Sequence, residues 1–159
     1  MSETAVEELA KELGEATGSP EATSEPSSAR KVTYVLDASA LLCLINDEPG
    51  AARVAGALSS SVISAVNLAE VATKLNELGA DAETARALLA PLHLTVAPFD
   101  EAAAFATGAL RTATRESGLS LGDRACLALT ASRGATALTT DKAWANVGER
   151  VGVTIEMLR

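Results

Sequence analysis

Short apolar segments alternate with longer stretches of helical pattern from Lys31 to the end of the chain. The five apolar segments, which we predict to be strands, are VTYVL (32–36), SVIS (61–64), LTVAPF (94–99), ATALTT (135–140) and VTIEML (153–158). The stretches between them carry apolar residues at helical spacing, and most of them end at Gly. This alternation predicts an α/β fold: a three-layer α/β/α sandwich with a central parallel sheet.

The first thirty residues do not share this pattern. Val6, Leu9 and Leu13 have helical spacing among several Glu residues, and the second half of the segment is rich in Ser, Pro, Thr and Glu. A helix of this length is marginal alone, and the Ser/Pro-rich half has nothing to bury. We therefore predict a flexible acidic extension over residues 1–30, able to form one short helix, and a globular domain over residues 31–159.

Composition and charge exclude several classes of protein. The chain has no run of about 18 apolar residues and an acidic N-terminus, so we expect a cytoplasmic protein without a membrane span or signal peptide. Cys43 and Cys126 lie in apolar helical segments, where we expect free thiols, and His93 alone makes no zinc site. The net charge of -8 argues against nucleic-acid binding through a broad basic face.

Four carboxylates follow the predicted strands or lie early in the helices. Asp37 directly follows the first strand and Asp141 the fourth, Glu70 lies early in the helix after the second strand, and Asp123 lies in the first turn of the helix at 119–134. Ligand sites of open α/β sheets lie outside the carboxyl ends of the strands. We therefore expect these acids to gather at one edge of the sheet.

Two of these acids also have an ordinary structural interpretation. Ser120 and Asp123 have the spacing of a capping box, and Glu70 has the spacing of a helical ion pair with Lys74. Four carboxylates that converge without Lys or Arg, however, would repel one another. Mg²⁺ prefers such oxygen ligands, and a pair of ions would activate a water and stabilise the leaving oxygen of a phosphodiester.

Four segments resemble the acidic motifs of PIN-domain nucleases, and more narrowly those of VapC-type toxins from toxin-antitoxin modules. The segments are YVLDASALL, SAVNLAEV, LSLGDRACLALT and ALTTDKAW, and the resemblance runs from Val32 to the C-terminus. It implies the strand order 3-2-1-4-5, which brings Asp37 and Asp141 side by side.

The resemblance also implies a role for each matching residue. The residues that match the catalytic, metal-binding set are Asp37, Glu70, Asp123 and Asp141, and the hydroxyls that match its supporting positions are Ser39 and Thr139. Arg124 is expected to face the substrate phosphate or a dimer partner, and Trp144 is expected to pack in the core. Ser39 has an alternative interpretation as the N-cap of the helix that follows it.

The function implied by the resemblance is that of a Mg²⁺-dependent endoribonuclease, with Mn²⁺ as a substitute ion. Such a protein is the toxin of a type II toxin-antitoxin system, and its expected partners are RNA, a cognate antitoxin and a second copy of the chain. Two alternatives are a receiver-like regulatory module and a haloacid-dehalogenase-type phosphatase. The first ordinarily has two adjacent acids after the first strand and the second has an Asp where Ser39 stands, so both fit poorly.

The extension lies outside this resemblance, and its role stays open. It is a solvated leader, a helix that docks on a partner, or an acidic lid that competes with RNA for the cleft.

Overall fold

The computed structural model describes residue 11 and residues 31–159, so the predicted extension lies outside the described residues except at that single position. Within the described part, one parallel sheet has the order β3-β2-β1-β4-β5, which confirms the predicted strand order. Its strands are β1 (Tyr34–Leu36), β2 (Ser61–Ser64), β3 (Val96–Ala97), β4 (Thr136–Thr139) and β5 (Thr154–Met157).

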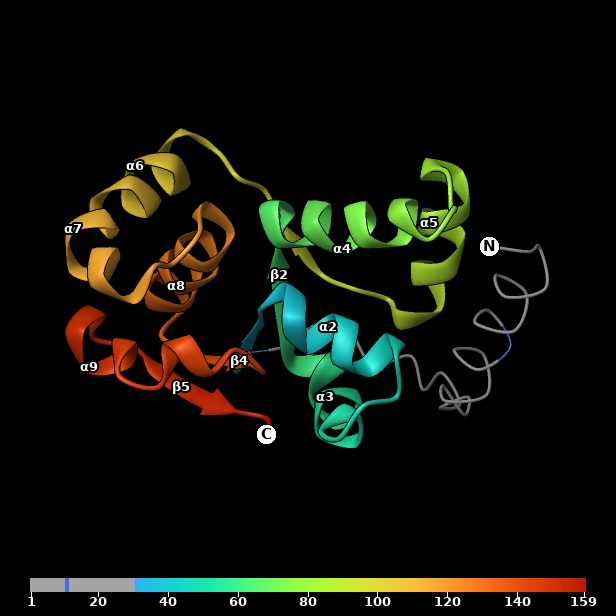
Figure 1. Cartoon of the computed structure of the whole chain (residues 1–159), viewed down its shortest axis with the longest axis horizontal. Helices are drawn as coiled ribbons and strands as arrows, with labels where there is room; N and C mark the ends of the chain where they lie inside the picture. The colour runs from blue at the N-terminus through green and yellow to red at the C-terminus, as the bar shows by residue number, and fades with distance from the viewer. Residues whose placement is uncertain (1–10, 12–30) are drawn as a thin grey trace.

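Helices cover both faces of the sheet (Figure 1). They are α2 (Ala38–Ile45), α3 (Ala51–Ala57), α4 (Ala65–Glu77), α5 (Ala82–Leu89), α6 (Glu101–Ala109), α7 (Arg111–Thr114), α8 (Leu121–Arg133) and α9 (Val147–Val151). Short 3-10 turns complete the connections: η1 (Leu58–Ser60), η2 (Ala90–Leu92), η3 (Arg115–Ser117) and η4 (Lys142–Trp144).

The sheet separates two hydrophobic cores, because successive side chains of a strand point to opposite faces. Leu36, Ile63 and Leu138 pack with α2 to α5 in one core. Val35 and Trp144 belong to the other core, together with α8 and α9. The three-layer sandwich is therefore confirmed, as is the packing role of Trp144, whose side chain is fully buried.

Element boundaries differ from the prediction in two ways. Four of the five strands are shorter than their apolar segments, whereas β2 matches its segment, and the helical stretch between the first two strands forms two helices, α2 and α3. The turn between them contains Asp47 at φ 49° and Gly50 at φ 107°. A left-handed backbone cannot continue an α-helix and suits Gly and Asp among few residue types, so the turn divides the helix there.

Side-chain caps start the helices that follow the sheet. Ser64 accepts a hydrogen bond from the N–H of Val66 at the start of α4, and Asp81 and Asp100 cap α5 and α6 in the same way. Each cap satisfies an N–H group that has no partner within its helix. The helix that carries Glu70 therefore begins at the carboxyl end of β2, as expected.

The state of the cysteines and the character of the helices were also considered from composition. Cys43 and Cys126 are free and buried, as predicted. Among the residues that the structure describes, none of the helices combines the length and the apolar character needed to cross a bilayer.

Candidate functional site

Asp37 lies at the centre of the carboxyl edge of the sheet, where β1 ends and α2 begins. Its side chain is only 3% exposed, and its Oδ2 accepts hydrogen bonds from Ser39 Oγ at 2.6 Å and from Thr139 Oγ1 at 3.0 Å. Thr139 comes close because β4 is the neighbour of β1. The alternative role of Ser39 as the N-cap is wrong: α2 begins at Ala38 with Asp37 at the cap position.

Backbone N–H groups orient the two hydroxyls. Thr140 N donates to Ser39 Oγ at 3.0 Å, and Asp141 N donates to Thr139 Oγ1 at 3.1 Å. A hydroxyl has one proton and two lone pairs. Because each of these hydroxyls accepts the backbone N–H through a lone pair, its proton remains available to donate to Asp37. Asp141 is thus linked to Asp37 through Thr139, while its own Oδ1 accepts from Ala143 N at 2.9 Å.

Glu70 is held against α8 by two residues to which the sequence analysis gave no role. The buried Asn67 Nδ2 donates both to Glu70 Oε2 and to the carbonyl oxygen of Gly122, each at 3.0 Å. A Cβ atom on Gly122 would overlap the Glu70 carboxylate, with Oε2 at 2.6 Å. Two features of the sequence could have pointed to these residues: Asn67 stands three residues before the acid Glu70, and Gly122 stands in the first turn of a helix, where Gly is unfavourable.

Asp123 both caps a helix and lies near other acids of the candidate site. Its Oδ2 accepts from Ser120 N at 2.8 Å, and its own N–H donates to Ser120 Oγ at 3.1 Å, which confirms the capping box. Its charge also raises the pKa of Asp37 and that of Glu70. Asp123 therefore lies near these two carboxylates while it caps α8.

Burial raises the pKa of Asp37, and its two hydroxyl donors offset only part of that shift. Burial likewise raises the pKa of Glu70; the Asn67 hydrogen bond lowers it, and the charges of Asp37 and Asp123 raise it further. Among the described residues, none of the four acids forms an ion pair with Lys or Arg. The alternative interpretation of Glu70 as the ion-pair partner of Lys74 is wrong, because Lys74 binds Glu77 at 2.8 Å instead.

The residues from 34 to 150, which include all four acids, match the PIN-domain family. The chain belongs to the PIN-domain family. PIN domains are nucleases, which makes this chain a member of a family of phosphodiester hydrolases, and PIN nucleases generally use divalent metals. The receiver-like and dehalogenase alternatives are excluded as family assignments. No curated protein matches the chain.

Solved structures of toxin-antitoxin complexes share the fold of this PIN domain. One chain of VapBC2 from Rickettsia felis, bound to a DNA fragment from its promoter, has a TM-score of 0.62 at 18% identity, over 79% of this chain and 98% of that chain. One chain of DNA-bound VapBC from Salmonella typhimurium has a TM-score of 0.59 at 22% identity, over 80% and 99%. FitAcB from Neisseria gonorrhoeae gives 0.59 at 16% identity, over 79% and 98%.

The acidic set of this PIN domain fits a hard divalent cation by its chemistry. All of its side-chain ligand atoms are carboxylate oxygens. Burial and mutual repulsion raise the pKa values of Asp37 and Glu70, and a bound cation would stabilise the charged forms of both side chains. Within residues 31–159, no three His, Cys, Asp or Glu side chains lie close enough to hold one ion together. Mg²⁺ typically binds one or two carboxylates directly and keeps several waters, so the spacing is compatible with this ion.

Arg124 points from α8 toward α6 in this structure. Its Nη1 donates to the carbonyl oxygen of Thr107 at 3.3 Å, and its buried Nε has no hydrogen-bond partner in the described part of the chain. A contact of Arg124 with substrate phosphate stays a prediction.

Gly122→Ala is expected to lower nuclease activity about 100-fold with little loss of thermal stability. The added methyl displaces the Glu70 carboxylate, and a misplacement of about 1 Å can cost that much in rate, while Ala favours the helix by about 1 kcal/mol. Gly108→Ala in α6 is the matched control, since its Cβ meets open space. Melting curves and cleavage rates measure both variants, and equal activity of the two would contradict the role of the close contact.

Proposed function

We propose that this PIN domain is a Mg²⁺-dependent endoribonuclease and the toxin of a type II toxin-antitoxin system. The observation that carries the proposal is the uncompensated set of carboxylates formed by the buried Asp37 and the half-buried Glu70 and Asp123, with Asp141 linked to Asp37 through Thr139. Such a cluster suits a divalent cation and phosphodiester chemistry, which need no His or Cys.

The residues of the chain hold and orient the reacting groups. Asp37, fixed by Ser39 and Thr139, would bind the ion directly with at most one other acid, and the rest of the set Glu70, Asp123 and Asp141 would contact it through its bound waters. The ion, when bound, supplies an activated water and stabilises charge on the leaving oxygen. Asn67 keeps the Glu70 carboxylate turned toward α8, so that it need not reorganise when the phosphodiester binds.

RNA binding to a chain with a net charge of -8 needs local cations rather than a basic face. A bound Mg²⁺ reverses the sign of the charge at the cleft. Arg111 and Arg115 are exposed, and guanidinium groups bind phosphate in a bidentate manner. A structured RNA would then be recognised largely by its shape.

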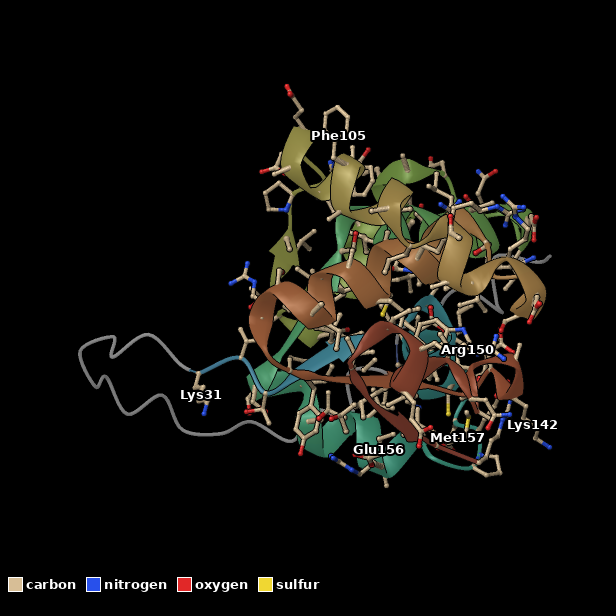
Figure 2. All side chains as sticks on the ribbon, turned by 90° about the vertical axis from the view of Figure 1, so that its left-hand side faces the viewer. Lys31, Phe105, Lys142, Arg150, Glu156 and Met157 are labelled. Atoms are coloured by element: carbon tan, nitrogen blue, oxygen red, sulfur yellow. The ribbon has the colours of Figure 1, made fainter. Side chains whose placement is uncertain are left out.

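Two protein partners belong to the proposal: an antitoxin that silences the nuclease, and a second copy of the chain. The similar folds of VapBC and FitAB chains, which occur in complexes with antitoxins, support the first. Phe105 supports a protein contact more generally, because its ring is 74% exposed and points away from α6 (Figure 2).

Incubation of the purified chain with Mg²⁺ and structured RNAs tests the function. We expect cleavage of RNA and not of DNA of the same sequence, and growth arrest when the chain is expressed in bacteria. Glu70→Gln is expected to remove both effects. Glu77→Gln, an exposed acid on the same helix, is the control and should retain them. Cleavage of DNA alone, or equal activity of the two variants, would overturn the proposal.

A further inference from the structure

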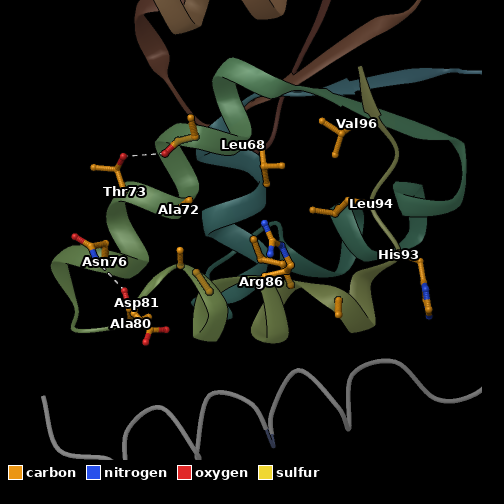
Figure 3. A pocket seen from close by; sticks show the side chains of 15 residues that line it. Leu68, Ala72, Thr73, Asn76, Ala80, Asp81, Arg86, His93, Leu94 and Val96 are labelled. Atoms are coloured by element: carbon orange, nitrogen blue, oxygen red, sulfur yellow. Dashed lines mark hydrogen bonds between the residues drawn. The ribbon is translucent and has the colours of Figure 1, made fainter. Parts of the chain in front are cut away.

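An apolar groove lies between α4, α5 and the edge strand β3. Its volume is about 690 Å³, and it is lined by Leu68, Leu94 and Val96 together with a series of Ala side chains from both helices. Figure 3 shows Leu68, Leu94 and Arg86 around the space between the helices and the strand. None of the four site acids lines the groove, so it is separate from the candidate nuclease site.

The groove is open because small side chains face one another across it. Ala72 of α4 and Ala85 of α5 line its walls, where longer side chains would fill the space. Val96 lies in the edge strand and pairs with Ile63, so both side chains are on the same face of the sheet. Val96 remains 40% exposed there. The sheet edge therefore offers apolar surface that one more amphipathic element could cover.

We propose that residues 2–14 of the same chain bind in this groove as an amphipathic helix. Their stripe of Val6, Leu9 and Leu13 is the apolar surface that needs a receiving face. A helix of this length spans about 20 Å, which equals the length of the 13-residue α4 along the groove.

The chain between the segment and the sheet is long enough. The registers of β1 with β2 and of β2 with β3 place Tyr34 level with Leu94, two strand spacings or about 10 Å away. Lys31 lies three residues earlier, at most about 10 Å further. The linker, residues 15–30, has a root-mean-square span of about 20 to 24 Å as a flexible chain, so it reaches the groove without being stretched.

The charged side chains of the groove lining are Arg86 and Asp81, both exposed, and Arg86 is the one that can pair with an acidic occupant. Residues 2–14 contain four Glu and one Lys. Arg86 is an exposed side chain of the groove lining and forms no ion pair within the described residues. Covalent attachment gives the segment an effective concentration on the order of mM, so a weak intrinsic affinity suffices for docking.

A spin label on Lys11→Cys in the full chain tests the proposal by NMR. Lys11 lies off the apolar stripe, and Cys43 and Cys126 are 1% and 0% exposed, so the label reacts at the new position alone. We expect paramagnetic broadening of the amides of Leu68, Leu94 and Val96. Adding Leu9→Asp should lower the docked fraction relative to the free one about tenfold or more, because it removes the burial of one Leu side chain.

Two control variants match the charge changes. Ala16→Asp adds the same charge in the linker and should leave the broadening unchanged. Arg86→Glu should weaken it, most clearly at low salt, while Arg111→Glu on α7 should not.

Three other patterns would overturn the proposal. Broadening at Asp37 and Ser120 would mean an acidic lid over the site. Broadening confined to residues next to Lys31 would mean a free leader. Broadening of an unlabelled, isotope-enriched chain by a spin-labelled one would mean that a second copy of the chain occupies the groove.

Discussion

Asp37→Asn is expected to abolish RNA cleavage while raising the thermal stability of the metal-free protein. Loss of activity should exceed about 1,000-fold, because the substitution removes the most buried carboxylate of the set that would hold the ion. Glu70→Gln, Asp123→Asn and Asp141→Asn should act in the same direction. Normal cleavage by two of these four variants in Mg²⁺ would show that the site is assigned wrongly.

The gain in stability follows from the sign of the pKa shift. Burial raises the pKa of Asp37 above its usual 3.8, so the folded chain holds this proton more tightly than the unfolded chain does. Stability therefore falls as the pH rises from about 4 through the raised pKa, and Asn cannot suffer this loss. At pH 7 without metal, a gain of about 1 kcal/mol would raise Tm by roughly 3 °C.

Thermal melts in EDTA between pH 4 and pH 8 measure this effect. The difference in Tm between Asp37→Asn and the parent chain should grow with pH. Asp47→Asn is the control: Asp47 is exposed, and Asn tolerates its positive φ, so the same charge is removed without relief of a buried group. An equal effect of both substitutions would show that net charge, and not the buried site, sets the stability.

Removal of divalent metal is expected to stop cleavage completely. EDTA should abolish activity, Mg²⁺ or Mn²⁺ should restore it, and a zinc-selective chelator should have no effect, because the four acids of the site offer carboxylate oxygens as ligands. Robust cleavage in EDTA by a highly purified sample would refute the mechanism.

Metal binding should also be visible without any assay of activity. A ligand at about 100 times its Kd stabilises the folded state by about 2.7 kcal/mol. Mg²⁺ should therefore raise the Tm of the parent chain by several degrees. The rise should persist in Asp47→Asn and disappear in Asp37→Asn, and an equal rise in both variants would place the ion elsewhere.

Much of the fold could be predicted because its signals are local. The spacing of apolar residues marked β1 and α4, and Ser120 marked the start of its helix. The separation of α2 from α3 was not predicted, although Pro49 and Gly50 in the turn between them are local signals of a chain turn. The short extent of β3 was missed because an edge strand pairs only where its single neighbour reaches it.

The site shows the same division. The positions of Asp37 and Asp141 after strands indicated the carboxyl edge of the sheet, and the strand order followed from the family resemblance. Asn67 and Gly122 escaped notice because their importance lies in a contact between α4 and α8, which are 55 residues apart at the hydrogen bond that joins them. Spacing alone did not decide between two local partners of Lys74, which binds Glu77, three residues later, while Glu70 accepts a hydrogen bond from Asn67.

Residue types and their local spacing thus determined the order of the elements, the two buried faces of the sheet and the chemistry of the acids, since hydrophobic periodicity and helix capping act over a few residues. Tertiary structure alone decided which atoms meet. Packing of α8 against α4 brings Gly122 onto the Glu70 carboxylate, and pairing of β4 with β1 brings Thr139 onto Asp37. The raised pKa values also arise at this level, because burial and the repulsion between distant acids exist only in the folded chain.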